Sequence, residues 1–465
     1  MMDKENGVKV VEVCLVAPKS GSPTSLPLTF YDRRCLRLLP VEHLFFYEFP
    51  KSSSPPSSSC SSFFDSVVPN LKHSLSLTLQ HFLPFAGNLT WSFHDSSSPF
   101  PIINYNPGDA VPLTIAESSN PQNFNIICSN LCEESKRHPL IPFLNTSDEK
   151  ASLLAIQATL FPTIGFCIGI TTHHAAADGI AISLFIRAWA YTCSKLLMES
   201  SPLSLSSLSL PEHLIPLYDR SVIRDSSTST ILEPNNRSLK LSYFRARGFK
   251  GLFELTPSHI HELKQHAKSK LKMKKVVRLS TYSVTFAFVL MCLAKTKQTN
   301  LKRVVFSISV NCRSRLDPPI MPTYFGNCSG PILGVIETTK LLENDGFMNA
   351  LNGILEALNR MEDAMSDESM DSRLKPFMED DIVTIFGSPI LQFYSVDFGW
   401  GKPKRVDLPI LDKVVPFSFS ESRNKNGGIE IGLTLNKKEI EAFSHHFTVA
   451  LKSLVGKGTK IRGKL

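Results

Sequence analysis

A serine- and proline-rich break midway along the chain is the feature that most constrains the fold. Residues 199–216 carry Pro202, Pro211 and Pro216 among many serines. Such a stretch sustains neither a helix nor a central strand, because proline lacks a backbone N–H group and fixes φ. We therefore expect a linker there, dividing the 465 residues into two parts that can each bury a core.

Strand and helix patterns interleave on both sides of this break. In the first part the apolar spacing predicts a strand over 8–15, a helix over 68–82, a hairpin over 151–172 and a helix over 179–197. In the second part Thr256 and Pro257 suit the start of a helix, residues 280–295 form an apolar helix, and residues 303–310 form a strand. The pattern predicts an α/β protein of two similar domains.

Composition excludes several classes. The chain is 42% hydrophobic and 20% charged, as in ordinary globular proteins, and no window approaches about 18 uninterrupted apolar residues. We therefore expect neither a membrane span nor a secretory signal. The net charge of +8 favours an anionic ligand but is too diffuse for a nucleic-acid surface. The ten cysteines form no CxxC pair, so we expect no zinc site, no disulfide framework and a cytoplasmic location.

The string THHAAADG, residues 172–179, is the sharpest local feature. It lies where an apolar strand ends and a helix begins, a junction that often carries chemistry. A neutral imidazole with a pKa near 6.5 can accept a proton at cytosolic pH. Asp178 could equally cap the following helix, so on these residues alone structural and catalytic roles both stay open.

Other chemistries fail on spacing. His261 and His266 lie five residues apart, about 140° around a helix, and cannot share one metal ion. The chain has no G-x-S-x-G nucleophile elbow, no Walker A loop and no G-x-G-x-x-G string. These patterns give no support to a zinc protease, an α/β-hydrolase or a nucleotide-binding protein.

Two further strings allow more than one interpretation. A basic run leads into Ser280 and Thr281, and it is either a solvated face or a phosphate site. This run comprises Lys264, Lys268, Lys270, Lys272, Lys274, Lys275 and Arg278. The string VDFGWGKP, residues 396–403, indicates a tight turn with a structural role.

Together these strings resemble the BAHD family of plant CoA-dependent acyltransferases. His174, Asp178 and Gly179 match its H-x-x-x-D-G pattern, and residues 397–401 match D-F-G-W-G in full. The string YFGNC at 324–328 is similar to the motif of the branch that acylates sugars of anthocyanins, flavonoids and other phenolic glycosides. The strings LPLTF at 26–30, YDR at 218–220, ESR at 421–423 and GGIEIG at 427–432 extend the resemblance along the chain.

The resemblance implies a fold of two chloramphenicol-acetyltransferase-like α/β domains with mixed sheets. It places an N-terminal domain at 1–198, a crossover linker at 199–238 and a C-terminal domain at 239–465. The active-site channel is expected between the domains, and a segment after Gly401 is expected to pack with the first. Members of the family are typically monomers.

The resemblance also implies the chemistry. His174 would be the general base of a ternary complex with an acyl-CoA co-substrate and a phenolic glycoside, with no permanent cofactor and no metal. His173 would be packed, and Asp178 would pair with an arginine, for which Arg313 is our candidate. Asp397 and Trp400 would be structural. The expected CoA contacts are Lys274, Lys275, Ser280 and Thr281.

The sequence leaves the donor open. A malonyl group needs a cation or several hydrogen-bond donors, whereas a coumaroyl or caffeoyl group needs an apolar slot. Overall resemblance favours malonyl-CoA slightly, although the run 180–183, IAIS, is more apolar than in many malonyl-transferring relatives. A hydroxycinnamoyl-CoA transferase is the alternative. A non-catalytic protein that binds phenolic metabolites is an alternative of a different class.

Overall fold

The structure is a computed structural model. It describes residues 7–50, 62–91, 100–198, 209–223, 237–241, 243, 245, 247–271, 279–297, 302–365, 382–409, 415–424 and 427–455. Lys274 and Lys275, and much of the expected linker, lie outside these residues.

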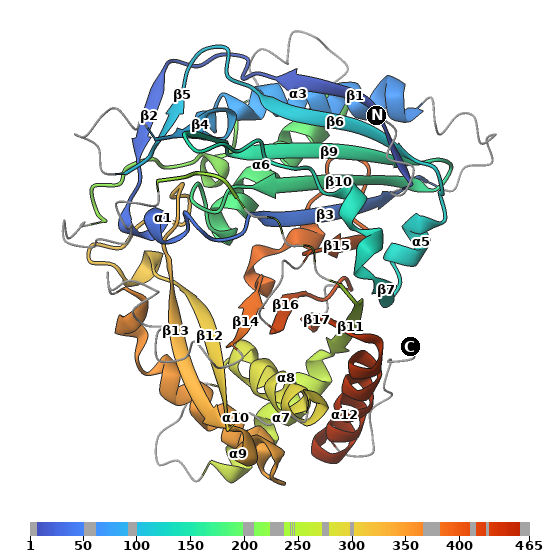
Figure 1. Cartoon of the computed structure of the whole chain (residues 1–465), viewed down its shortest axis with the longest axis vertical. Coiled ribbons are helices and arrows are strands. Elements are labelled where there is room, and N and C mark those ends of the chain that lie inside the picture. The colour runs from blue at the N-terminus through green and yellow to red at the C-terminus, as the bar shows by residue number, and fades with distance from the viewer. Residues whose placement is uncertain are drawn as a thin grey trace.

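The first half is built on a mixed sheet. Its strands are, in spatial order, β1 (Val8–Val16), β6 (Val111–Ser118), β9 (Leu154–Phe161), β10 (Gly165–Thr172), β3 (Val41–Glu48) and β15 (Arg405–Asp407). Two helices, α3 (Val68–Leu79) and α6 (Gly179–Met198), pack together behind this sheet (Figure 1). By length and composition α6 could cross a membrane, but most of its side chains are buried, as in the core helix of a folded domain.

Smaller elements complete the first half. They are α1 (Phe30–Arg34), α4 (Leu83–Ala86), α5 (Asn123–Ile127) and a small sheet of β2 (Thr24–Pro27), β5 (Ile102–Tyr105), β4 (Asn88–Thr90) and β8 (Lys150–Ser152).

The second half carries a second mixed sheet, in the lower part of Figure 1. Its strands are, in order, β13 (Ser329–Glu337), β12 (Arg303–Asn311), β14 (Ile382–Phe386), β16 (Val415–Glu421), β17 (Ile429–Leu435), β11 (Phe249–Leu255) and β7 (Leu131–Glu133). The helices of this half are α7 (Pro257–Lys270), α8 (Thr281–Lys297), α9 (Thr338–Leu342), α10 (Gly346–Leu358) and α12 (Lys437–Val455).

Elements with strong local patterns are confirmed. Strands β9 and β10 form the predicted antiparallel hairpin, with Phe161 opposite Gly165 at its tip. The side chain of Thr256 accepts a hydrogen bond from the His259 N–H group, and Pro257 takes the first turn of α7. The two-domain α/β architecture with mixed sheets is therefore present.

Two short strands cross between the halves. β7 comes from the first half of the chain and pairs with β11, whereas β15 comes from the second half and pairs with β3. Asp407 of β15 joins the crossing points, because its buried carboxylate forms ion pairs with Arg137, just beyond β7, and with Lys250 of β11 at 2.5 Å. A cut at residue 239 thus leaves a strand of each half in the sheet of the other.

Candidate active site

The loop 173–178 joins the end of β10 to the start of α6. The His173 N–H group donates to the Leu153 carbonyl at 2.9 Å, and the Ala176 N–H group donates to the His173 carbonyl at 3.0 Å. The three alanines of the loop are fully buried. Their small side chains let the loop pack into the core of the first half.

The two histidines of this loop differ. The His173 ring is fully buried, and its Nδ1 accepts a hydrogen bond from the Ala175 N–H group at 3.2 Å. Burial lowers the pKa of His173 to about 3, so the ring stays neutral. His173 is therefore held as part of the packing of the loop.

His174 is only partly buried. Its Nδ1 is buried and has no hydrogen-bond partner among the described residues, which leaves Nε2 as the nitrogen that can meet a substrate. Burial lowers the pKa of His174 below its ordinary value, while its own backbone, Asp178 and Asn327 act in the opposite direction. The ring is neutral near pH 7 and can accept a proton.

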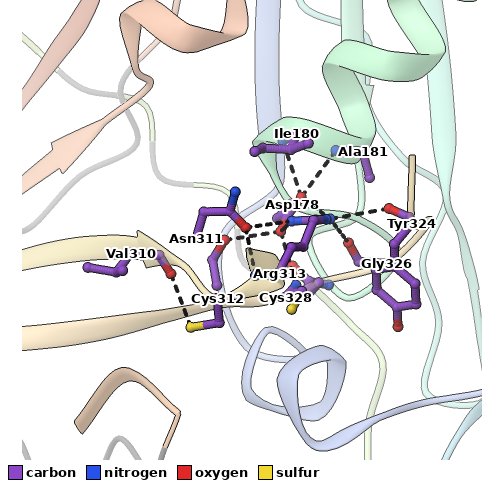
Figure 2. Close-up of polar contacts among 12 residues, drawn as sticks. Asp178, Ile180, Ala181, Val310, Asn311, Cys312, Arg313, Tyr324, Gly326 and Cys328 are labelled. Carbon is purple, nitrogen blue, oxygen red and sulfur yellow. Dashed lines mark hydrogen bonds and ion pairs between the residues drawn. The ribbon is translucent and has the colours of Figure 1, made fainter. Parts of the chain in front are cut away.

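Asp178 caps α6 and also forms an ion pair, so the structure combines the two roles that its sequence position allows (Figure 2). Its Oδ1 accepts hydrogen bonds from the N–H groups of Ile180 and Ala181, both at 3.1 Å. The Arg313 guanidinium donates to both carboxylate oxygens, at 2.7 and 2.9 Å. Burial alone would raise the pKa of Asp178, but Arg313 outweighs it and holds the pKa below its usual value.

Arg313 connects Asp178 to the second half of the molecule. It begins the short 3₁₀ turn Arg313–Arg315 after β12, and its side chain is 2% exposed. Its Nη2 also donates to the carbonyls of Tyr324 at 3.2 Å and Gly326 at 3.0 Å. The structure thus places Arg313 against Asp178, as the resemblance led us to expect, and adds the YFGNC segment to the pair (Figure 2).

The DFGWG segment lies away from this loop. The Asp397 Oδ1 accepts hydrogen bonds from the N–H groups of Gly399 at 2.7 Å and Gly401 at 2.9 Å, which closes a tight turn. Phe398 is fully buried edge-on to Trp189, and the Trp400 ring meets the Phe166 ring with centroids 5.6 Å apart. Both partners belong to the first half, so the turn attaches the late part of the chain to it.

The turn and the histidine lie near opposite ends of α6. A Cβ atom on Gly399 would meet Ser194 and Leu197 in the last turns of this helix. His174 precedes its first residue, Gly179. Leu197 lies 18 positions after Gly179, which is a rise of about 27 Å along the helix. Asp397 and Trp400 therefore have structural contacts and lie far from the candidate base.

The described CoA candidates lie at the start of α8. The Ser280 Oγ accepts a hydrogen bond from the Ser283 N–H group at 2.9 Å, so this hydroxyl caps the helix. The Thr281 Oγ1 accepts one from the Lys264 Nζ at 2.9 Å. No contact brings Ser280 or Thr281 to His174 within the described ranges. The remaining candidates, Lys274 and Lys275, lie outside them.

Three residues near His174 carry no role in the sequence prediction. The Asn327 Nδ2 donates a hydrogen bond to the His174 carbonyl at 2.9 Å, and Asn327 is held by Asp32, which pairs with Arg220. They lie in or beside the strings YFGNC, LPLTF and YDR. Their presence in motif strings was the only available signal, because their contacts join residues far apart in the chain.

Metal chemistry finds no support in the described part of the chain. No group of three or more His, Cys, Asp or Glu side chains there could hold a metal ion. The candidate site is the loop that carries His174, and contacts from both halves of the molecule hold this loop in place.

The site thus combines a partly exposed His174 between two α/β halves with the buried Asp178–Arg313 pair behind its loop. The chain matches the Transferase family over residues 7–450 and belongs to this family, the BAHD acyltransferases. It needs an acyl-CoA as co-substrate.

Curated relatives match nearly the whole chain. Phenolic glucoside malonyltransferase 1 of Arabidopsis thaliana is 34% identical and covers 94% of this chain and 97% of its own length. Malonyl-CoA:anthocyanidin 5-O-glucoside-6''-O-malonyltransferase of the same plant is 34% identical, covering 97% of this chain and its own full length. Agmatine coumaroyltransferase, again from Arabidopsis thaliana, is 33% identical, with coverage of 94% and 97%.

Solved structures share the fold. Vinorine synthase superposes with a TM-score of 0.66 at 21% identity, covering 96% of this chain and 98% of its own. TRI101 of F. sporotrichioides, solved with coenzyme A and T-2, has a TM-score of 0.66 at 15% identity, with coverage of 91% and 97%. At these identities the likeness concerns the fold.

Proposed function

We propose that this protein transfers an acyl group from an acyl-CoA to a sugar hydroxyl of a phenolic or anthocyanin glucoside, with His174 as the general base. The observation that carries this proposal is the neutral, partly exposed His174 ring on a loop fixed by the Asp178–Arg313 pair. The malonyltransferases among the relatives support the substrate class.

The proposed reaction uses the His174 Nε2 as the base. In a ternary complex the acceptor hydroxyl gives its proton to the His174 Nε2 while its oxygen attacks the thioester carbonyl carbon. The tetrahedral intermediate then collapses, the carbon–sulfur bond breaks, and the CoA sulfur leaves with the proton from His174. A positioned base of this kind contributes about 10²–10⁴-fold to the rate.

Asp178 takes no part in this proton transfer. Its two oxygens accept six hydrogen bonds, from Arg313, Ile180, Ala181, Cys328 and Ser329. A buried carboxylate that is so fully bonded, with a lowered pKa, is a poor proton acceptor. Its function is to hold the loop on which His174 stands.

Malonyl-CoA is the favoured donor. Two of the relatives named above are malonyltransferases that act on glucosides, at 34% identity. A hydroxycinnamoyl donor is the second candidate, because agmatine coumaroyltransferase is 33% identical to this chain. Arg187 is a cation on α6, the helix that follows the motif, but no contact between it and His174 is found among the described residues.

The alternative of a different class is a protein that binds phenolic metabolites without catalysis. The candidate base, its Asp178 capping contacts and the Arg313 pair are all present here. A binding protein has no need of this arrangement.

We also propose that the protein acts as a cytoplasmic monomer. The described cysteines carry no disulfide, which suits a reducing compartment. Size-exclusion chromatography with light scattering tests the oligomeric state; a dimer mass would contradict the proposal.

The experiment incubates the purified protein with malonyl-CoA and with coumaroyl-CoA in separate reactions, each with a panel of flavonoid and anthocyanin glucosides. Free thiol and product mass are followed together. We expect CoA release that depends on the glucoside, and a product heavier by one malonyl group.

The other outcomes are equally informative. A coumaroyl product would replace the favoured donor by the second candidate. CoA release without an acceptor would identify a thioesterase. Ligand binding without any product from either donor would contradict the proposed transfer and favour the binding protein.

A further inference from the structure

We propose that Asp32 and Arg220 are positioning residues for His174 and that they act through Asn327. The inference rests on the proposed function of His174 as the base. The three residues come from α1, the crossover segment and the YFGNC string, and a continuous chain of hydrogen bonds joins them to the loop.

The first link in this chain is Asn327. Its Nδ2 donates a hydrogen bond to the His174 carbonyl at 2.9 Å, so it fixes the backbone of the residue that carries the base. The side chain is 1% exposed, and its Oδ1 accepts a contact from the Cys35 thiol at 3.5 Å. The amide therefore has a fixed orientation toward the loop.

The second link is Asp32, which is fully buried. Its Oδ1 accepts hydrogen bonds from the Asn327 N–H at 2.8 Å and from the Asn327 Nδ2 at 3.0 Å. Its Oδ2 accepts from the Thr29 N–H at 2.9 Å and the Thr29 Oγ1 at 2.7 Å. One carboxylate thus ties the start of α1 to the amide that holds His174.

The third link is Arg220, which supplies the counter-charge to Asp32. Its Nη1 lies 2.5 Å from the Asp32 Oδ2 and 2.6 Å from the Pro27 carbonyl oxygen. The Arg220 side chain is only 11% exposed, so solvent screens this pair weakly. Burying Asp32 without such a cation would be costly, since a buried charge needs a partner.

The crossover segment brings Arg220 to the YFGNC segment through its backbone. The Leu217 N–H group donates to the Thr323 carbonyl at 2.9 Å, and the Phe325 N–H group donates to the Leu217 carbonyl at 2.8 Å. A Cβ atom on Gly326 would lie 2.9 Å from the Tyr324 hydroxyl and 3.1 Å from the Arg220 Nη2, so a side chain there would crowd the guanidinium. The linker is therefore part of the support of the active-site loop.

This support matters because general-base catalysis depends on geometry. A misplacement of about 1 Å can cost a factor near 10² in rate. Asp32 is fully buried and reaches the loop through Asn327, and Arg220 pairs with Asp32. Their loss should therefore change the placement of the His174 ring rather than the binding of the donor. The signature is a fall in kcat with little change in the donor KM.

The experiment compares Asp32→Asn, Asp32→Ala, Arg220→Gln and Asn327→Ala with the wild type. We expect kcat to fall about 10- to 100-fold in Asp32→Ala and Asn327→Ala, with the donor KM within about twofold. Asp32→Asn keeps an acceptor for Asn327 and should retain more activity than Asp32→Ala. The matched control is Asp148→Asn, since Asp148 pairs with Lys240 on the surface.

The pH profile adds a readout that a general loss of structure would not move. Asn327 raises the pKa of His174, so Asn327→Ala should shift the acidic limb of kcat/KM to lower pH. Asp178 is the other charged group that acts on the pKa of the His174 ring, the neighbouring His173 stays neutral, and neither is changed in these variants. Thermal melts confirm that each variant is folded at the assay temperature.

Two outcomes separate the failure of this inference from the failure of the proposed function. In the first outcome, the wild type and Asp148→Asn transfer acyl groups, and the Asp32 and Asn327 variants have the same kcat and the same acidic limb of kcat/KM as the wild type. The inference is then wrong and the proposed function stands. If the wild type transfers nothing, the function is wrong. A histidine NMR titration, with His174 assigned from His174→Ala, then still tests whether Asn327→Ala lowers its pKa, and an unchanged pKa overturns the inference.

Discussion

At the scale of single residues, Asp178 and Arg313 illustrate how a motif can be read only in part from sequence. The H-x-x-x-D spacing left Asp178 as either a helix cap or a member of the active site. The structure shows that one oxygen caps α6 while both oxygens meet the Arg313 fork. Local sequence carries the first contact, whereas the second joins residues 135 positions apart and needed the family resemblance.

Removing one partner of the Asp178–Arg313 pair should destabilise the folded protein strongly. Arg313→Gln should lower the free energy of unfolding by about 3–5 kcal/mol, because it leaves a buried carboxylate without its cation. Arg313→Lys keeps the positive charge but loses the paired donation of the guanidinium to both carboxylate oxygens. It should therefore recover only part of the lost stability. Urea unfolding measures both.

The control for this series is Arg315→Gln in the same 3₁₀ turn. The Arg315 Nη1 donates to the Asn311 carbonyl at 2.5 Å, but the contact is exposed. The free energy of unfolding of Arg315→Gln should fall by less than about 1 kcal/mol. Equal losses in Arg313→Gln and Arg315→Gln would show that the buried pair does not stabilise the loop.

At the scale of elements, local pattern predicted what lies within one segment. The β9–β10 hairpin, α6 and the capped start of α7 all follow from periodicity and capping residues. Local pattern does not reveal strands β7 and β15, since each has three residues and pairs with a strand from the other half. Their pairing is set by tertiary packing, which leaves no local signal. That a segment after Gly401 packs with the first half was expected only from the family resemblance.

The two glycines of the DFGWG turn allow the cost of a steric clash to be separated from the cost of backbone strain. Gly399 has φ of +106°, and a Cβ atom there would lie 2.5 Å from the Leu197 Cδ1. Gly401 has φ of +92°, but a Cβ atom there would meet nothing within 4 Å. Both alanine variants suffer strain of about 1–3 kcal/mol, and Gly399→Ala must also displace the Leu197 side chain and crowd the Ser194 Cα atom at 3.2 Å.

Chemical denaturation of Gly399→Ala and Gly401→Ala measures this difference. We expect Gly399→Ala to be the less stable variant, while kcat per folded molecule stays near the wild-type value in both. Equal stability, or a specific loss of kcat in Gly401→Ala, would contradict a purely structural role for the turn.

At the scale of the whole molecule, the two halves are tied by exchanged strands and by buried charges. Asp407, Arg137 and Lys250 join β15, β7 and β11, and Arg245, which lies just after the expected linker, pairs with Glu42 of β3 at 2.8 Å. The sequence predicted two domains and a linker, but it could not show that the linker contacts both. Those contacts depend on side chains that meet only after the halves have packed.

The raised pKa of Glu42 leads to a prediction of how the stability of the protein depends on pH. Burial raises its pKa from an ordinary value near 4.5 to about 7, although Arg245 opposes the shift. Between these two values the folded protein binds more protons than the unfolded chain, so stability falls as pH rises through the interval. Glu42→Gln removes this dependence and keeps an acceptor for Arg245.

Melting temperatures between pH 5 and pH 8 measure the effect. The difference between Glu42→Gln and the wild type should become more positive as pH rises, whereas an exposed control, Glu441→Gln, should show a constant difference. Parallel curves for Glu42→Gln and the wild type would contradict the raised pKa.

The central claim is that the His174 Nε2 removes the acceptor proton. The most direct test measures glucoside-dependent thiol release from malonyl-CoA by the wild type, His174→Ala and the exposed control His445→Ala. We predict a fall of about 10²–10⁴-fold in His174→Ala, an unchanged rate in His445→Ala, and donor binding retained in both. A His174→Ala enzyme that is folded and keeps more than about a tenth of the wild-type rate would contradict the account.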